Sequence, residues 1–486
     1  MSIVRIGVFT NRYSKRKKVM SVKNETVVGE SEQIVDDISN EESNEEIVDQ
    51  DVMAQLKAKM AKKKAEEVKT VEEPVKEVEE KKVIKIIEKK KRSINIGVCG
   101  TGQAGSRVAS TFAELGYKSI AINTAIQDLS FIQHIPESNK LHLDYGPGGT
   151  SKELSIGLDS ATHYKDEIYA LIADKLSDCN VFLLATSLGG GSGAGGSEVI
   201  IDVMNSIGLP VIVLTILPQS VDDSQTKSNA LTTLSKFAKM VQNKQIANLI
   251  LIDNAKIETI FADVSQMDFF DISNRAICLP IDAFNKFSAQ PSKVKSLDPA
   301  EALKLFIGSE GLSTFGEIDV FNFEEPTAIA EAVINNMNTN LLAGSFDLAQ
   351  TKYAGVLFVG HPKVMSSIPS SSVNYAMSLI RETCPSAESV FRGIYEDPDM
   401  EENVLKVYSL FTGMGLPSQR VDQLRKETLE ENAKVKGRDQ ARNLSLQLDS
   451  GTEATISSAE QVRNLIKKQS SAFHKSFVGI KDFRKK

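Results

Sequence analysis

A glycine-rich segment at residues 186–196 is the part of this sequence best suited to chemistry. It reads Thr186-Ser-Leu-Gly-Gly-Gly-Ser-Gly-Ala-Gly-Gly196 and directly follows an apolar run. Each glycine costs conformational entropy on folding, so a purely structural turn rarely uses this many. Close approach of backbone N–H groups to a phosphate chain does require them. No Lys-Ser or Lys-Thr pair follows the glycines, so the segment is not a Walker A loop.

A second glycine turn, Gly100-Thr-Gly-Gln-Ala-Gly105, joins an apolar run at residues 93–99 to a helical pattern at residues 106–115. Backbone N–H groups at a helix N-terminus attract phosphates. A dinucleotide-binding loop has similar glycines, but it also expects an acidic residue at the end of the second strand. That strand ends in Ala121-Ile-Asn-Thr124. A nicotinamide-dependent oxidoreductase is therefore the least favoured alternative.

The elements that must position these loops alternate along the chain from residue 93. Apolar strands are predicted at 93–99, 119–123, 181–186, 210–217 and 248–253, and a long helix at 265–290. Further strands are predicted at 311–320, 354–360, 387–395 and 403–413, in a second α/β layer, and a polar helix from 418 to about 436. Continuous Val/Ile/Leu strands separated by helices predict a parallel sheet covered on both faces.

Composition excludes several classes of protein. The net charge is −7 over 486 residues and the isoelectric point is near 5.6, so direct sequence-specific binding of nucleic acid is not expected. The four cysteines and five histidines are scattered, which indicates neither a disulfide framework nor a metal site. No apolar run is long enough to span a bilayer and no secretory signal is recognisable. We expect no membrane insertion and a cytoplasmic location.

Several motifs together resemble the tubulin/FtsZ superfamily. Residues 189–195 are similar to the GGGTGSG signature of tubulin and FtsZ, with Ser192 in the Thr position. Residues 121–128 are similar to the INTDAQ loop of FtsZ, and residues 145–150 fall where the family has a glycine-rich loop facing the γ-phosphate. Loop order and spacing agree over roughly residues 93–435.

The resemblance implies an α/β fold of the tubulin/FtsZ type: a Rossmann-like GTPase domain with a parallel sheet, joined by a long central helix to a smaller α/β domain. It implies GTP and GDP as ligands, Mg²⁺ as the accompanying ion, and hydrolysis of GTP to GDP and phosphate. The residues it implies in nucleotide binding are Gly102, Gln103, Ala104, Asn123, Thr124, Gly148, Gly149, Thr150, Gly189, Gly190, Gly191, Ser192, Gly193, Asp222, Asn254, Phe270 and Asn274. It implies no protein residue as a metal ligand.

Two of these positions also have a purely structural interpretation. Phe270 and Asn274 are one helical turn apart and share a face. An aromatic ring there would cover the guanine face, and an amide would read the edge of the base. A core Phe and a helix-capping Asn are the alternative.

The resemblance further implies that the next subunit supplies the catalytic acid, from a loop after the central helix. Leu297-Asp-Pro-Ala-Glu301 keeps the Asp-x-x-acidic spacing of FtsZ, which makes Asp298 and Glu301 the candidate catalytic residues. Asp298 before Pro299 is also a typical helix start, so a capping role is the compatible alternative. A competing alignment places residues 311–319 at this loop and matches only Asp319. We prefer Asp298 because the predicted central helix ends immediately upstream.

The segment at residues 406–424 resembles the end of the core of TubZ-type tubulins of plasmids and phages. This resemblance implies a head-to-tail filament that segregates or positions plasmid or phage DNA, or other cargo, in a bacterial or phage-infected cytoplasm. In TubZ systems the tail binds a DNA-bound adaptor protein, and the basic residues within 462–486 imply a similar partner. A solvated tail is the alternative.

The expected domains follow from a change of composition near residue 93. Residues 30–51 carry ten acidic side chains and no Lys or Arg, and residues 53–92 are rich in Lys and Glu. We therefore expect a disordered charged extension at 1–92, a GTP-binding domain at 93–264, the central helix at 265–291, a second, activation domain at 292–415, a C-terminal helix at 416–436 and a flexible basic tail at 437–486.

Two further functions stay open on the sequence. One is a nucleotide-binding filament or scaffold with little or no hydrolysis, because Ser192 replaces Thr. The other is an FtsZ-like division protein. Such a protein usually ends in a short partner-binding peptide, and residues 478–483 do not clearly match one.

Overall fold

The computed structural model describes residues 91–265 and 267–446. Residues 1–90, for which we expect disorder, lie outside the described residues. So does most of the segment 437–486, which we expect to form a basic tail. The fold below is that of residues 91–262 and 270–446, which belong to one compact unit.

The first half of this unit is a parallel sheet. Its strands are β1 (Ile96–Thr101), β2 (Lys118–Asn123), β3 (Lys140–His142), β4 (Val181–Ser187), β5 (Val211–Leu217) and β6 (Asn248–Asp253). All ladders between them are parallel, in the order β3-β2-β1-β4-β5-β6. Apart from the short β3, the strands are buried at nearly every position, because helices cover both faces.

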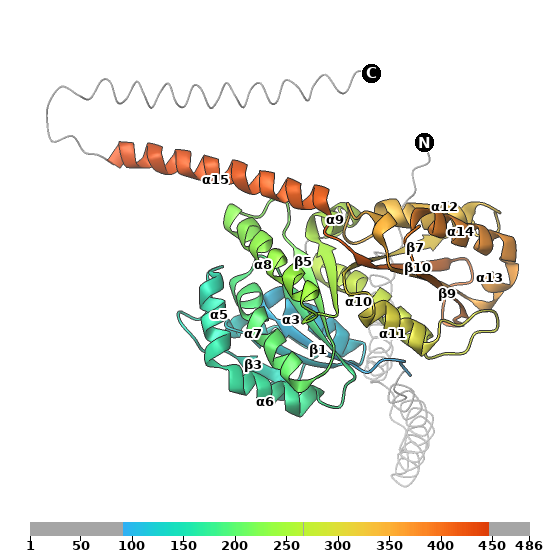
Figure 1. Cartoon of the computed structure of the whole chain (residues 1–486), viewed down its shortest axis with the longest axis horizontal. Coiled ribbons are helices and arrows are strands. Elements are labelled where there is room, and N and C mark those ends of the chain that lie inside the picture. Colours follow the sequence, from blue (N-terminus) through green and yellow to red (C-terminus); the bar gives the residue numbers. More distant parts are fainter. Residues whose placement is uncertain (1–90, 266, 447–486) are drawn as a thin grey trace, which may run out of the picture. The chain divides into compact units, whose positions relative to one another are not determined.

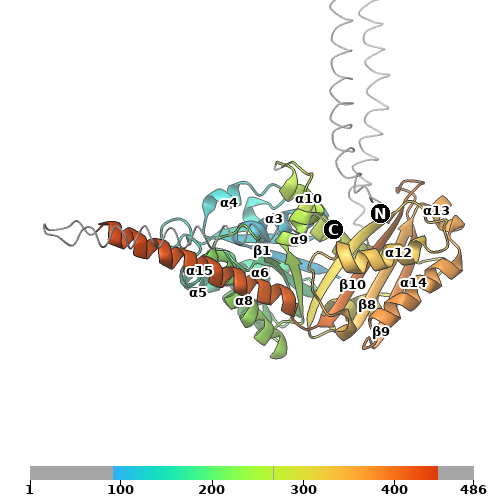
Figure 2. The same cartoon turned by 90° about the horizontal axis from the view of Figure 1, so that it is seen from above.

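The helices of this half are α3 (Gly102–Glu114), α4 (Ile126–Ser130), α5 (Leu154–His163), α6 (Lys165–Leu176), α7 (Gly191–Ile207), α8 (Ser224–Gln242) and α9 (Asn254–Ile260). Figure 2 shows α3 and α10 on one side of β1 and α6 and α8 on the other. Helices α3 and α7 begin within the glycine segments, and α3 begins before residue 106, where periodicity first predicts it. Apolar periodicity cannot detect a first turn made of Gly, Ser and Ala.

The second half contains α10 (Phe269–Phe287), α11 (Pro299–Ile307), β7 (Leu312–Val320), α12 (Ala328–Asn335), β8 (Tyr353–Gly360), α13 (Pro362–Ser367), α14 (Ser370–Thr383), β9 (Ser389–Glu396), β10 (Leu405–Met414) and α15 (Ser418–Leu446). In Figure 1, α10 and α11 cover one face of its strands and α12 and α14 the other. Strand β10 is antiparallel to both of its neighbours, β7 and β8.

The sequence predicts the later strands as a second layer, and this detail is wrong. They extend the first sheet into one ten-stranded sheet, in the order β3-β2-β1-β4-β5-β6-β7-β10-β8-β9. The joining ladder is short: Leu249 pairs with Leu312 and Ile250 with Ser313. A buried hydrogen bond from Ser313 Oγ to Asn248 Oδ1 (2.6 Å) supports it. The α/β fold class predicted from the sequence is confirmed.

Two helices differ in length from their predicted ranges. Helix α10 occupies 269–287 rather than 265–291, because Ser265 closes a turn with Asp268 and because Pro291 disfavours helical backbone in the residue before it. Helix α15 continues ten residues beyond residue 436. Good helix formers follow Gly437, and an ion pair joins Arg442 to Asp439 one turn earlier (3.3 Å).

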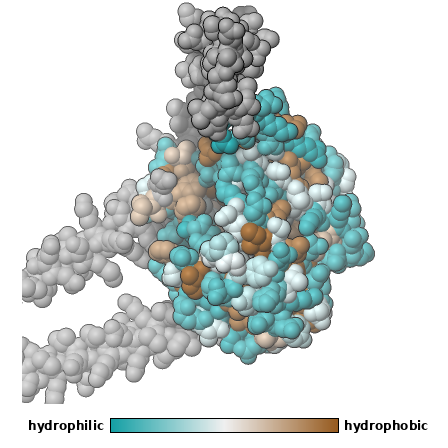
Figure 3. All heavy atoms as spheres, turned by 90° about the vertical axis from the view of Figure 1, so that its left-hand side faces the viewer, coloured by the Kyte–Doolittle hydropathy of each residue, from teal (hydrophilic) through white to brown (hydrophobic). Residues whose placement is uncertain are grey.

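The described surface carries no sign of a membrane span. No helix within residues 91–265 and 267–446 is long and apolar enough to cross a bilayer. On the face shown in Figure 3, apolar residues are scattered among hydrophilic ones rather than gathered into one patch. Scattered apolar residues of this kind are normal on protein surfaces.

Candidate nucleotide site

The loops singled out in the sequence follow neighbouring strands at one edge of the sheet. Five of them follow β1, β2, β4, β5 and β6, and the loop at residues 145–150 follows β3; all six strands are parallel, so their carboxyl ends meet at the same edge. Open α/β sheets bind ligands in the crevice at that edge. Gly102–Ala104 begin α3, Asn123 ends β2, Gly191–Gly193 begin α7 and Asn254 begins α9.

The two glycine loops are in contact with each other. Gly102 has φ +69°, a left-handed conformation that favours glycine, and a Cβ added there would lie 2.9 Å from the Gly193 nitrogen. A Cβ added at Gly193 would lie 2.9 Å from the Thr101 carbonyl oxygen and 2.8 Å from Thr186 Oγ1. Glycine at both positions lets the first turns of α3 and α7 lie against each other.

The N-termini of α3 and α7 remain available to an anion. Neither helix has a side chain that caps it, and neither has an acidic residue in its first turn. The first N–H groups of a helix have no partner within the helix, and they carry the positive end of its dipole. The two helix starts together therefore form a backbone cradle for phosphate groups.

Three hydroxyl groups from three different loops meet beside this cradle. Ser192 Oγ lies 2.5 Å from Thr124 Oγ1 and 3.4 Å from Thr150 Oγ1. Thr124 and Thr150 are buried. The structure thus brings together the loop after β2, the loop before α5 and the main glycine loop, as the order of the motifs predicts.

Asp128 joins two of the predicted residues and was not itself singled out. Its Oδ1 accepts a hydrogen bond from Gln103 Nε2 (3.0 Å), and its Oδ2 accepts one from Asn123 Nδ2 (3.0 Å). The Asn123 oxygen in turn accepts the N–H of Ala125 (3.3 Å). Asp128 thereby fixes the orientation of both amide side chains. The signal for it was its place at the end of the motif at residues 121–128.

The loop between β3 and α5 has an unusual backbone. Gly146, Gly148, Ser151 and Lys152 all have positive φ, at +73°, +80°, +46° and +67°. Ser and Lys rarely adopt this conformation, and such strain concentrates at functional sites. Added Cβ atoms at Gly148 and Gly149 would meet nothing within 4 Å, so these two glycines border open space.

Lys152 ties this loop to the start of α8. Its Nζ forms an ion pair with Asp223, which also caps α8 by accepting the N–H of Thr226 (2.9 Å). Asn229 Nδ2 donates both to the Lys152 carbonyl oxygen (2.7 Å) and to that of Gly189 (3.1 Å). The strained loop is therefore held against the glycine loop by residues of α8. Sequence reasoning missed Lys152, Asp223 and Asn229.

We expect Lys152→Met to raise the pKa of Asp223 toward its usual 3.8. Partial burial raises this pKa, but hydrogen bonds from Lys152 and Thr226 and the charge of Lys152 outweigh it and lower the pKa to about 2. The contribution of Asp223 to stability is therefore present above pH 3.8 and is lost as the pH falls toward 2. A carboxyl titration followed by NMR measures the shift.

The matched control for this titration is Lys236→Met, which removes another surface ion pair of α8, with Glu198. It should leave the pKa of Asp223 unchanged. An unchanged pKa in Lys152→Met would mean that the two hydrogen bonds from Thr226 hold Asp223 ionised without Lys152.

The residues predicted to bind the base lie at the same edge of the sheet, but they form fewer contacts with the other loops. The guanidinium of Arg107 lies over the ring of Phe270 (4.6 Å), which is half exposed. Asp222 accepts the N–H of Gln219 (2.8 Å). Among the described residues, neither Asn254 nor Asn274 hydrogen bonds to a side chain of the other loops. Burial, followed by the charges of Asp222 and Asp253, raises the pKa of Glu258 on α9.

The C-terminal helix α15 is tied to these loops by two buried cations. Arg420 Nε lies 2.6 Å from Asp253 Oδ2, and Arg420 Nη2 donates to the Pro218 carbonyl oxygen (3.3 Å). Lys227 is fully buried and contacts the Ser220 carbonyl oxygen (2.7 Å) and Glu431 of α15 (2.7 Å). Burial alone would lower the pKa of Lys227, but Glu431 and Glu427 outweigh it and raise the pKa.

Asp298 and Glu301 form a capping box at the start of α11. Glu301 N donates to Asp298 Oδ1 (2.8 Å), and Asp298 N donates to Glu301 Oε2 (3.1 Å). The capping alternative is therefore present in the structure, and it fixes where both carboxylates lie. The competing Asp319 lies within β7, where it pairs with Lys406 (2.6 Å).

The phosphate-binding loops and the candidate catalytic acids lie at opposite ends of α10. Phe270 near its start contacts Arg107 of α3, whose first turn belongs to the phosphate cradle. Asn285 near its end exchanges hydrogen bonds with Ile94, just before β1 begins (2.8 and 2.9 Å). Residues 270–287 of a helix span about 27 Å. The structure therefore does not bring Asp298 and Glu301 to the glycine loops of the same chain.

No group of three or more His, Cys, Asp or Glu side chains able to hold a metal ion occurs within residues 91–265 and 267–446. An ion at this edge of the sheet would therefore take most of its ligands from the bound nucleotide and from water, as Mg²⁺ commonly does.

Comparisons with known proteins agree with this geometry. Tubulin-like protein CetZ of Pyrococcus abyssi is 25% identical over 326 residues, which cover 65% of this chain and 85% of that protein. A GTPγS-form protofilament structure of TubZ from Bacillus thuringiensis serovar israelensis has a TM-score of 0.65 and 20% identity, covering 73% of this chain and 96% of the other. A structure described as type III plasmid segregation TubZ gives 0.61 and 18%, covering 71% and 94%.

The two structural likenesses establish the fold, and the sequence profile of the tubulin/FtsZ family GTPase domain matches residues 95–262. These residues hold the glycine loops, the three hydroxyl groups and the strands that position them. The match decides against a nicotinamide-dependent oxidoreductase. The chain therefore carries a GTPase domain of the tubulin/FtsZ family, a domain that hydrolyses GTP.

Proposed function

We propose that this protein assembles head to tail into GTP-dependent filaments, in which adjacent subunits share each catalytic site. The observation that supports this most is the placement of the loops along α10. The phosphate cradle lies near Phe270 and the acidic pair lies beyond Phe287, so about 27 Å of helix separates them. A carboxylate at residue 298 meets a nucleotide only when a second copy of the chain presents it.

Within the proposed site, each element has a separate task. The first turns of α3 and α7, with Gly102–Ala104 and Gly189–Gly193, hold the phosphates, and Gly148–Thr150 border the γ-phosphate. Asp222 contacts the ribose, and Asn254, Phe270 and Asn274 bind guanine. Asp298 and Glu301 of the neighbouring copy position the attacking water and accept its proton, a contribution typical of general bases.

Mg²⁺ fits this site as the ion bound together with GTP. Mg²⁺ prefers oxygen ligands and is usually held by phosphates, waters and one or two protein groups. The hydroxyls of Thr124, Thr150 and Ser192 supply such oxygens, as does the carboxylate of Asp128. When bound, the ion neutralises negative charge on the phosphate oxygens.

A head-to-tail contact joins two different surfaces of the same protein. When the rotation between successive subunits does not close a ring, such a contact repeats without end and produces a filament. The GTPγS-form protofilament of TubZ from Bacillus thuringiensis supports the same arrangement for this chain.

For the cellular role, we propose movement or positioning of plasmid or phage DNA, or of another cargo, in a bacterial cytoplasm. The likeness to TubZ and the basic residues within 462–486 support a DNA-bound adaptor protein as the partner.

Phosphate release measured against protein concentration, with sedimentation in parallel, tests the shared site. We expect the rate per subunit to rise steeply above a critical concentration, at which pellets first form with GTP. A rate per subunit that is independent of concentration, with nothing sedimenting, would rule out the shared site. Pellets without phosphate release would instead favour a scaffold that only binds nucleotide.

A further inference from the structure

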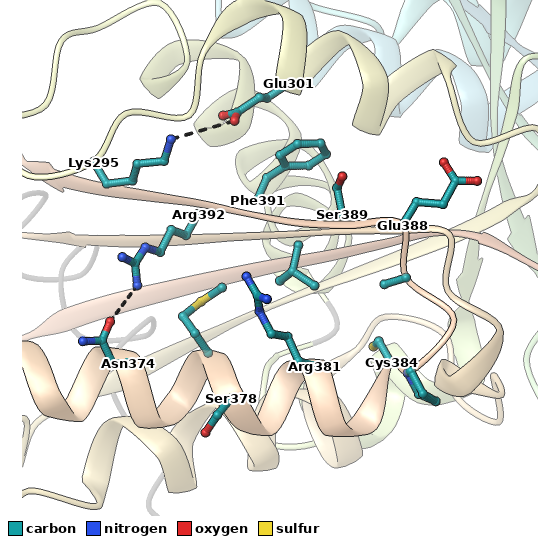
Figure 4. Close-up of a pocket in the computed structure, with 14 residues that line it drawn as sticks. Lys295, Glu301, Asn374, Ser378, Arg381, Cys384, Glu388, Ser389, Phe391 and Arg392 are labelled. Atoms are coloured by element: carbon teal, nitrogen blue, oxygen red, sulfur yellow. Dashed lines mark hydrogen bonds and ion pairs between the residues drawn. The ribbon is translucent and has the colours of Figure 1, made fainter.

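A cavity of about 760 Å³ lies beside β9 (Figure 4). Strand β9 ends the sheet on the side opposite to the strands whose loops form the phosphate cradle. Helix α14, strand β9 and the segment at residues 295–301 line it. Its volume is within the range typical of ligand sites in proteins. The proposed function leaves this cavity unused, except that Glu301 is one of its lining residues.

The cavity follows the open edge of β9. This strand ends the sheet and, among the described strands, pairs with β8 alone. At Ile394 the N–H donates to the Lys295 carbonyl oxygen (2.9 Å), and the Ile394 carbonyl accepts from Ser292 Oγ, so both groups point away from β8. Backbone groups alternate along a strand. Val390 and Arg392 therefore present their N–H and C=O groups to the cavity.

Residues from both faces of β9 line the same cavity. Figure 4 shows Phe391 and Ser389 on the side of Glu301, and Arg392 directed toward α14. A half-open cavity that borders the edge of a strand on both faces leaves room for one more strand. An open strand edge is a template for an extended polypeptide, which supplies the missing backbone hydrogen bonds.

The side chains around this edge favour a negatively charged occupant. Three cations line the cavity: Lys295, Arg381 and Arg392. Lys295 pairs with Glu301 (3.9 Å), whereas neither arginine forms an ion pair with a described residue, and Arg392 donates to the neutral Asn374 (2.9 Å). The two acidic residues of the lining already have partners. Glu301 belongs to the capping box, and Glu388 accepts the hydroxyl of Tyr353 (2.9 Å).

We propose that the edge of β9 is a docking site for an extended acidic segment of a partner protein, which adds a strand to the sheet. Carboxylates two residues apart on that segment face Arg381 and Arg392. The residue between them points to the opposite face, because side chains alternate along a strand, and it packs as an apolar group beside Phe391.

The test uses the full chain and a fluorescein-labelled peptide, acetyl-Ser-Glu-Val-Glu-Val-Glu-Ser-amide, followed by fluorescence anisotropy. We expect saturable binding that weakens at least about tenfold when lysine replaces each glutamate. The double substitution R381E and R392E should weaken binding to the same extent. R425E is the matched control, because Arg425 is an exposed arginine on α15, and it should bind the peptide like the unchanged protein.

Methylation of the peptide backbone separates strand addition from simple charge attraction, and it leaves the protein unchanged. Methyl groups on alternate nitrogens block hydrogen bonds along only one edge of the peptide. We expect methylation of one edge to abolish binding and methylation of the other edge to preserve it. Equal binding of both methylated peptides, or no binding of the parent peptide, would overturn the proposal.

Discussion

Replacing Asp298 by asparagine is expected to reduce GTP turnover about 10³-fold, while filaments still sediment in the presence of GTP. The reduction is the middle of the range by which a positioned general base accelerates a reaction. Asparagine is as good a helix cap as aspartate, so the start of α11 should be preserved. Because Asp298 lies far from the phosphate cradle of its own chain, nucleotide binding should be unaffected. Phosphate release and sedimentation on the same samples measure both properties.

Two comparison variants distinguish a catalytic role of Asp298 from a structural one. Asp298→Ala removes both the charge and the cap, so it should be as inactive as the asparagine variant and less stable by about 1 kcal/mol. Full activity of Asp298→Asn together with loss of activity in Asp298→Ala would assign the residue to helix capping alone. Asp319→Asn tests the competing alignment, and it should keep its turnover because Asp319 is paired with Lys406 within β7.

Gly193→Ala is expected to weaken GTP binding about 10³-fold. The added Cβ would lie 2.8–2.9 Å from Thr186 Oγ1 and the Thr101 carbonyl oxygen, closer than real Cβ contacts. The start of α7 must then move away from α3, which opens the phosphate cradle. Loss of two hydrogen bonds to a charged ligand, at about 2 kcal/mol each, corresponds to that change in affinity. Equilibrium titration with a fluorescent GTP analogue measures the dissociation constant.

Gly344→Ala is the matched control for this substitution, because an added Cβ there meets nothing within 4 Å. It should bind the analogue like the unchanged protein. Unchanged affinity in Gly193→Ala would mean that the two glycine loops tolerate a methyl group between them. The cradle inferred from their contact would then be wrong.

The sequence predicts well those parts of the site that depend on loop order. Five loops follow five parallel strands, and parallel strands bring their carboxyl ends to one edge whatever the details of packing. For this reason Thr124 and Ser192 meet although they are far apart in the chain. Thr150 joins them from the loop after β3, a strand that the sequence does not predict. The placement of Asp298 beyond the central helix follows from chain order in the same way.

The residues that sequence reasoning missed act through long-range contacts between charged or amide side chains. Lys152 pairs with Asp223, and Arg420 reaches Asp253 from 167 positions away. Such pairs have no local periodicity, and surface lysines and arginines resemble one another in a sequence. Only the packing of α8 and α15 against the loops shows which of them are buried or paired.

The sequence also could not predict that all ten strands form one continuous sheet. A ladder of two residue pairs between β6 and β7 decides whether there are two sheets or one. Each strand carries the same apolar pattern in either case. The difference depends on tertiary contacts such as the hydrogen bond between Ser313 and Asn248.

Helix α15 also determines where this chain can be shortened or tagged. Its first turns supply Arg420 to the ends of β5 and β6, and Glu427 and Glu431 to the buried Lys227. A version cut before residue 418 would remove the charged partners of Lys227 and Asp253, and breaking buried ion pairs in this way strongly destabilises proteins. A fluorescent label intended for microscopy therefore belongs after Leu446, where it leaves both anchors of the helix in place.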